Sequence, residues 1–210
     1  MHISEGVLSG PVLISGGVLA AAGTAIGLKK LDYDQVARVG LLSAAFFVAS
    51  LIHVPVGPSS IHLVMNGLVG LLLGWAAFPA ILVALILQAV FFQFGGITTL
   101  GVNTLIMALP AVACYYLFGP WIHTKNPWPL AVAFGCGFFA VFLSALCAAL
   151  ALVFTEESFL EVAWLVVLSN LPLMFIEGIV VAFCVAFLKK VQPALLPGFR
   201  KQAQGSRFQS

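Results

Sequence analysis

Long apolar runs dominate this chain, and short segments between them hold most of its polar residues. A helix that spans a bilayer needs about 20 consecutive apolar residues, with a floor near 17. Measured against that length, the chain is predicted to contain seven spanning segments. Their expected ranges are 8–28, 35–52, 62–77, 78–93, 99–118, 129–154 and 171–188.

Three of the boundaries depend on local signals. Phe78-Pro79 is expected to divide one long apolar run into two spans, because proline disfavours helix at the residue before it and starts a helix readily itself. Residues 157–170 are expected to form a short interfacial helix, since Glu157 and Glu161 lie one turn apart beside an apolar face. The proline-containing polar tail, 191–210, is predicted to be disordered.

Composition places these runs in a membrane. Hydrophobic residues make up 62% of the 210 residues and charged residues only 8%, with a mean hydropathy of +1.14. A soluble domain is excluded by so little charge. We therefore expect an all-α integral membrane protein, a bundle of about seven transmembrane helices in one domain, 1–190, followed by a cytoplasmic tail. The net charge of +2 says little about partners, and no nucleic-acid partner is expected.

The basic residues predict the orientation, because lysine and arginine collect on the cytoplasmic side. An outer N-terminus places all nine on that side and leaves His2, His53 and His62 outside. We expect a multi-pass protein of a bacterial or archaeal plasma membrane. A cleaved signal peptide is the alternative for the first span, but Glu5, and no basic residue, precedes it, so the mature chain is expected to begin at Met1.

The outer histidines are candidate metal ligands. The amine of Met1, the backbone nitrogen of His2 and the His2 ring can close two fused chelate rings around one ion. A fourth nitrogen would complete the planar set that Ni²⁺ and Cu²⁺ favour. His62 is the candidate for that fourth position, with His53 behind it. The alternative for each histidine is an ordinary surface or interfacial residue.

Three stretches carry a resemblance to a known family: the start "MHISEG", the segment "VPVGPSSIHLVMNGLVGLLLG" and the segment "FFQFGGITTLGVNTLIMALP". Together they resemble the CbiM/NikM substrate-binding components of energy-coupling factor transporters for cobalt or nickel. The resemblance implies seven helices and a square-planar metal set from Met1, His2 and His62. Asn66 and Asn103 match family positions near the site and are expected to help form it.

Two positions depart from that family's pattern. Ile106 stands where a second asparagine is common, which puts the surroundings of the metal in doubt. His53 stands where the family has no fixed ligand, so it is a candidate for a transient ligand during entry.

The resemblance also implies partners. The sequence has no GxxxxGK[ST] phosphate loop, so uphill uptake requires separate ATPase subunits and a membrane coupling subunit, with a small accessory membrane subunit as a further candidate. Small residues let helices approach closely in lipid. The pairs Ala21/Ala25 and Gly23/Gly27 on the first span are candidates for docking the coupling subunit, and packing inside the bundle is the alternative.

Glu177 is a carboxylate predicted to lie inside the last span. Proton coupling, metal passage and a hydrogen bond between helices are its candidate roles. We favour the hydrogen bond, with a protonated Glu177 donating to an asparagine or a backbone carbonyl.

The favoured function is capture of Co²⁺ or Ni²⁺ at the outer face for ATP-driven import, which would feed cobalamin synthesis or nickel enzymes. The ion is cargo, and no cofactor is expected. The ligands leave the choice of metal open. A secondary carrier or channel with incidental histidines is the alternative. A membrane enzyme is disfavoured, because a planar nitrogen set leaves no open position and no evident general base.

Overall fold

The computed structural model describes residues 3–56, 59–122 and 128–196, with the backbone alone for 53–56 and 59–61. Its helices are α1 (Gly10–Lys29), α2 (Val36–Ala49), α3 (Asn66–Leu73), α4 (Ala77–Phe92), α5 (Leu100–Phe118), α6 (Pro129–Thr155), α7 (Leu160–Ser169) and α8 (Leu171–Val191). Short 3-10 turns occupy Tyr33–Gln35, Gly74–Ala76, Gly119–Trp121, Glu157–Phe159 and Pro193–Leu195. Two strands, β1 (His53–Val56) and β2 (Ser59–His62), form an antiparallel hairpin between α2 and α3.

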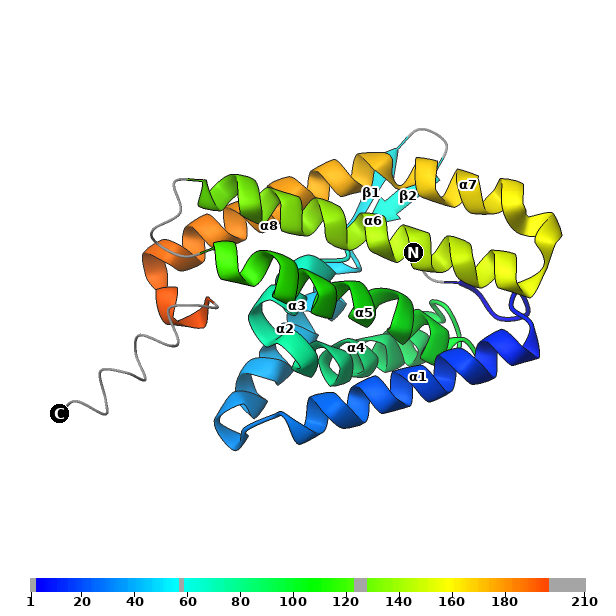
Figure 1. The fold of residues 1–210 in the computed structure, drawn as a ribbon, viewed down its shortest axis with the longest axis horizontal. Coiled ribbons are helices and arrows are strands. Elements are labelled where there is room, and N and C mark those ends of the chain that lie inside the picture. The colour runs from blue at the N-terminus through cyan, green and yellow to red at the C-terminus, as the bar shows by residue number, and fades with distance from the viewer. Residues whose placement is uncertain (1–2, 57–58, 123–127, 197–210) are drawn as a thin grey trace.

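The long helices lie side by side as a membrane bundle. Among the described residues, five stretches are long and apolar enough to cross a bilayer: Gly10–Lys29, Asn66–Phe92, Leu100–Trp121, Pro129–Thr155 and Glu157–Val191. In Figure 1, α1 and α8 finish, and α2 and α6 begin, at one end of the bundle, while α1 begins and α6 finishes at the other. The chain is thus a predominantly helical, multi-pass membrane protein, and the expected count of seven spans stays a prediction.

The predicted bounds of α1, α5 and α6 agree with the structure to within two residues, and those of α8 to within three. The second predicted span is shorter than expected, because α2 has 14 residues and is about 21 Å long.

The third predicted span is wrong. His62 ends a strand, and α3, which starts at Asn66, has eight residues and is about 12 Å long. The helix breaks at Gly74, whose φ of +57° suits glycine, and not at Phe78-Pro79. Pro79 lies in the first turn of α4, where its missing N–H removes no helical hydrogen bond.

The expected helix over 157–170 is present as a 3-10 turn followed by α7. It packs along α6 and leads almost directly into α8, so that Glu157–Val191 forms one helical stretch of 35 residues beside α6 (Figure 1). Pro172 is the second residue of α8. Asn170 lies at the junction, and its Nδ2 donates a hydrogen bond of 2.7 Å to the carbonyl of Val166.

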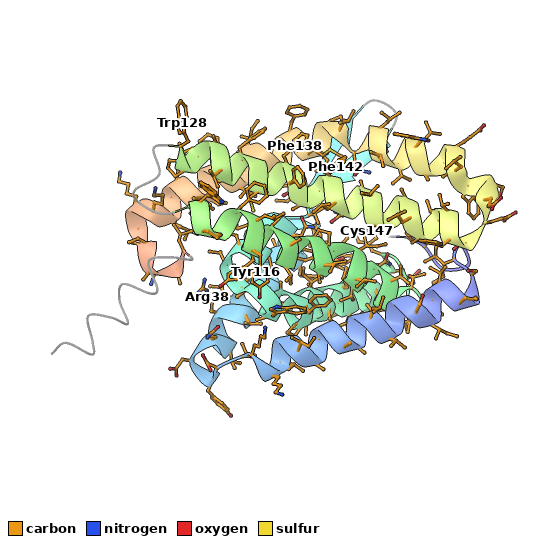
Figure 2. All side chains as sticks on the ribbon, viewed as in Figure 1. Arg38, Tyr116, Trp128, Phe138, Phe142 and Cys147 are labelled. Carbon is orange, nitrogen blue, oxygen red and sulfur yellow. The ribbon has the colours of Figure 1, made fainter. Side chains whose placement is uncertain are left out.

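The short helix α3 lies at the centre of the bundle, and all its residues from Asn66 to Leu72 are buried. Arg38 of α2 donates to the carbonyl of Leu72 at 2.8 Å and to that of Leu195 at 2.7 Å. Figure 2 shows Arg38 at the end of the bundle where α2 begins. The C-terminal end of α3 is therefore joined to the segment that follows α8.

That segment extends the ordered region past the predicted boundary at residue 190. After α8 the chain forms the turn Pro193–Leu195, and the side chain of Leu196 is fully buried. The remainder of the expected disordered tail, 197–210, lies outside the described residues.

The small residues of α1 divide into two groups. Gly23 and Gly27 are buried, Gly23 against the Phe78 ring and Gly27 against Pro79 and the backbone of Trp75. For these two, the alternative of packing inside the bundle is the correct one, because neighbouring helices of the same chain cover them. Ala21 and Ala25 are exposed on the opposite face of α1.

The segment before α1 is attached to the loop between α4 and α5. The Glu5 N–H donates to the carbonyl of Gly95 at 3.1 Å, and the Glu5 carboxylate accepts hydrogen bonds from the Thr98 N–H (3.1 Å) and hydroxyl (3.3 Å). Gly96, with φ of +136°, lies so close to Glu5 that a Cβ there would overlap its side chain. The hydrogen bond from the Thr98 backbone lowers the pKa of Glu5.

This attachment predicts a pH dependence. A carboxyl group whose pKa is lowered by folding stabilises the folded state above its ordinary pKa, here 4.5, and loses that contribution as the pH falls through the lowered value. Glu5→Gln should therefore speed amide exchange at Thr98 at neutral pH, and the difference from wild type should shrink on acidification. Hydrogen exchange measured across that range checks this. Glu157→Gln, at an exposed position on another loop, is the control and should leave Thr98 unchanged. A difference that persists in acid would contradict the assignment.

Candidate metal-binding site

The predicted ligands Met1 and His2 lie outside the described residues, but the residue that follows them is held firmly. Ile3 is 9% exposed, and its N–H donates to Asn103 Oδ1 at 3.0 Å. Asn103 Nδ2 donates back to the Ile3 carbonyl at 3.1 Å and to Thr99 Oγ1 at 3.2 Å. Asn103 lies in the first turn of α5 and is 2% exposed. One side chain thus satisfies both backbone polar groups of Ile3, the residue next to His2.

The candidate fourth ligand, His62, is the last residue of the hairpin. The register pairs the backbone of His62 with that of His53, and the Leu63 N–H extends the pairing by donating to the Ile52 carbonyl at 3.3 Å. The His62 side chain is partly buried, with Nδ1 3.3 Å from the Leu63 carbonyl oxygen.

Sequence reasoning missed this hairpin. The signal that could have found it is the pair of short stretches, "HVPV" and "SSIH", around Gly57-Pro58, because β-branched residues flanking such a dipeptide are typical of a turn between strands.

Glu177 of α8 binds the backbone directly after His62. Its carboxylate accepts a short hydrogen bond from the Val64 N–H, and its two oxygens lie 2.9 and 3.0 Å from the Met65 nitrogen. Glu177 is fully buried, as is Val64 at 1% exposure. The predicted hydrogen bond between segments is present, but its predicted direction is wrong. Glu177 is the acceptor, because the first N–H groups at the start of α3 have no partner within the helix.

Asn66, the first residue of α3, is fully buried and ties three helices together. Its Nδ2 donates to the Met107 carbonyl of α5 at 3.3 Å and to Ser144 Oγ of α6 at 2.8 Å. Its Oδ1 is buried without a hydrogen-bond partner among the described residues. Ile106, which stands at the family's asparagine position, is buried in the apolar core.

Residues close to each predicted half of the site belong to the apolar core of the bundle. Ile3, which follows His2, and Val64, which lies two residues after His62, both belong to the large buried cluster of the core. Within the described part of the chain no three His, Cys, Asp or Glu side chains gather as a metal site. The geometry therefore consists of two firmly held peptide segments, each next to predicted nitrogen ligands.

Comparison with known proteins identifies the family. The family model of the cobalt uptake substrate-specific transmembrane region, CbiM, matches residues 2–195. A putative metal transport protein of Haemophilus influenzae is 43% identical over 201 residues, covering 93% of this chain and 97% of that protein. The cobalt transport protein CbiM of Sorangium cellulosum is 32% identical, covering 93% and 94%.

Two further matches concern a fusion protein and a solved structure. The fused nickel transport protein NikMN of Rhodobacter capsulatus is 42% identical over 124 residues, which is 54% of this chain and 35% of that protein. The crystal structure of a transition metal transporter superimposes with a TM-score of 0.78 at 26% identity, covering 91% of this chain and 93% of that one.

The match to the family model extends over nearly the whole chain and includes the segments that hold Ile3, His62 and Glu177. The family consists of transport components and not of enzymes. The chain belongs to the CbiM family of cobalt uptake substrate-specific transmembrane proteins and is a cobalt or nickel transport component.

Proposed function

We propose that this protein captures Ni²⁺ or Co²⁺ in a planar set of four nitrogens: the Met1 amine, the His2 backbone and ring nitrogens, and the His62 ring. The observation that carries the proposal is the pair of hydrogen bonds between Asn103 and Ile3. A free chain end loses conformational entropy when it chelates an ion. Because Asn103 already fixes the adjacent peptide, less of that entropy remains to be lost on binding.

We place the metal site on the outer side of the membrane. The basic residues of the described helices lie at the end of the bundle where α1 and α8 finish and α2 begins: Lys29, Lys30, Arg38, Lys189 and Lys190. The opposite end carries Glu5, Glu156 and Glu157 on its loops. The excess of lysine and arginine favours a cytoplasmic position for the basic end of the bundle in a plasma membrane. We therefore propose that the N-terminus lies outside and that the single domain, 1–190, crosses the bilayer seven times. The C-terminal tail would then lie in the cytoplasm.

We propose that ATP-driven partners of the energy-coupling factor type drive import, and that the imported metal feeds cobalamin synthesis or nickel enzymes. The missing phosphate loop supports separate ATPase subunits, and the fusion of the NikMN relative supports a membrane partner, with a small accessory subunit as a candidate. Ala21 and Ala25 remain the proposed docking residues for the coupling subunit, because they are small and exposed on α1.

His53 is proposed as a transient ligand during entry, because its backbone pairs with that of His62. The alternative of a secondary carrier lacks support from Glu177, since both oxygens of that buried carboxylate accept backbone hydrogen bonds. A proton or ion pathway through Glu177 would first have to break them.

The proposed site predicts that a free N-terminal amine is essential. A few residues added ahead of Met1 leave every side chain in place and remove only the amine and the chelate ring that it closes. We expect the affinity for Ni²⁺ and Co²⁺ to fall by at least about tenfold, measured by titration of the purified protein in detergent. Equal affinity in the two versions would refute the terminal site. The ratio of the two metal affinities in the native version tests selectivity.

We expect Asn103 to support metal binding through its two hydrogen bonds to Ile3. Asn103→Leu keeps the branched shape of the side chain and leaves both polar groups of Ile3 without their partner, a loss comparable to about 1–3 kcal/mol for buried groups. We expect a roughly tenfold weaker Ni²⁺ affinity in the same titration. Thr104→Val is the matched control, because Thr104 is the next residue of α5 and its hydroxyl bonds only the Leu100 carbonyl of the same helix. Similar affinities for both variants would contradict the proposed role.

A further inference from the structure

We propose that Glu177 is a positioning residue for His62: from the last helix, it fixes the N–H groups two and three residues after the ligand, at Val64 and Met65, and thereby sets the direction of the imidazole. The proposal rests on the proposed metal site at His62 and adds to it a residue 115 positions away along the chain. The contacts that carry it are those between the Glu177 carboxylate and the N–H groups of Val64 and Met65.

The junction after His62 needs an external anchor. Met65 has a φ of +51°, in the left-handed region that residues with a side chain rarely adopt. Such a conformation persists where the surroundings hold it in place. The Glu177 carboxylate supplies that hold, because it engages the Met65 N–H with both oxygens and the preceding Val64 N–H as well. The backbone conformation of the turn from strand β2 into α3 therefore depends on a contact with α8 and not on the residues of the turn alone.

The carboxylate is itself mounted rigidly. A Cβ at Gly137 of α6 would lie 2.5 Å from the Glu177 carbonyl oxygen, and a Cβ at Gly178 would lie 2.7 Å from the Phe134 ring. Gly67 of α3 packs on the same part of α6, where its Cβ would lie 3.2 Å from Gly137 Cα. α3 and α8 thus both seat on α6 through glycines. The distance between Glu177 and the junction is fixed by backbone contacts, not by flexible side chains.

This geometry separates positioning from two other roles. As both oxygens are engaged with backbone N–H groups, Glu177 is not arranged as a metal ligand or a proton carrier. Glu177 could also act only by stabilising α3 as a whole. A contact at the other end of the same helix provides a control for that role. Arg38 binds the Leu72 carbonyl near the end of α3, and Leu72 lies eight positions after Val64 in the chain.

The test compares Glu177→Gln with Arg38→Gln in the full chain. Glutamine is nearly isosteric, but it is uncharged, and its NH₂ group would face the Met65 N–H that the second carboxylate oxygen accepts, leaving a single neutral oxygen for both junction N–H groups. We expect Glu177→Gln to weaken Ni²⁺ binding by about tenfold or more and to change the visible d–d absorption of bound Ni²⁺, which reports the geometry of its ligands. Arg38→Gln should lower the thermal midpoint while leaving the affinity and the absorption as in wild type.

A second variant covers the case in which Glu177→Gln does not fold. Met65→Gly tolerates the positive φ without strain, so the double variant Glu177→Gln/Met65→Gly should fold and still show the weakened binding and changed absorption. Met65→Gly alone, which keeps the carboxylate, should bind Ni²⁺ close to wild type.

His62→Ala distinguishes failure of this inference from failure of the proposed site. If His62→Ala binds Ni²⁺ as wild type does, the proposed metal site is wrong. If His62→Ala loses binding while Glu177→Gln keeps both the affinity and the absorption, the positioning role alone is overturned. Equal losses of affinity in Glu177→Gln and Arg38→Gln would also overturn it, because they would reduce the role of Glu177 to support of α3.

Discussion

The fold depends on burying both ends of one short helix in an apolar bundle. α3 has eight residues and reaches neither end of the bundle, so its unpaired N–H and carbonyl groups need partners from the protein. The Glu177 carboxylate accepts hydrogen bonds from the two N–H groups just before α3, and Arg38 donates to the Leu72 carbonyl near its C-terminal end. The signs match the helix dipole, with a carboxylate at the positive end and a guanidinium at the negative end. Two of the few charged residues in the chain therefore serve a single buried element.

That constraint links the candidate site to the other end of the molecule. The N-terminal side of α3 follows the hairpin with His62, whereas its C-terminal side contacts Arg38, which also binds the Leu195 carbonyl beyond α8. Because the glycines of α3 press on the backbones of α5 and α6, the helix has little room to shift alone. The two ends of α3 are therefore held by separate contacts, with Glu177 before its first residue and Arg38 at the Leu72 carbonyl.

The sequence predicted the elements whose length alone defines them and missed those that depend on distant contacts. α1, α5, α6 and α8 follow from apolar runs bounded by polar residues or proline. The start of α3 was mistaken, because hydropathy does not distinguish a hairpin and a short buried helix from a span. The role of Asn103 at the metal site stays a prediction, and its observed partner Ile3 lies 100 residues away, where no local pattern could reveal it. The acceptor role of Glu177 depends on N–H groups 112 and 113 residues away, which no local pattern reveals.

The two halves of the candidate site differ in how they are held. His62 follows a hairpin and precedes a helix fixed by Glu177, Asn66 and glycine contacts, all within the buried core. The N-terminal half depends on Asn103 at Ile3 and on Glu5 at an exposed loop, and exposed hydrogen bonds contribute less because water competes for both partners. If one half must move to admit and release an ion, opening at the N-terminal side breaks fewer buried contacts.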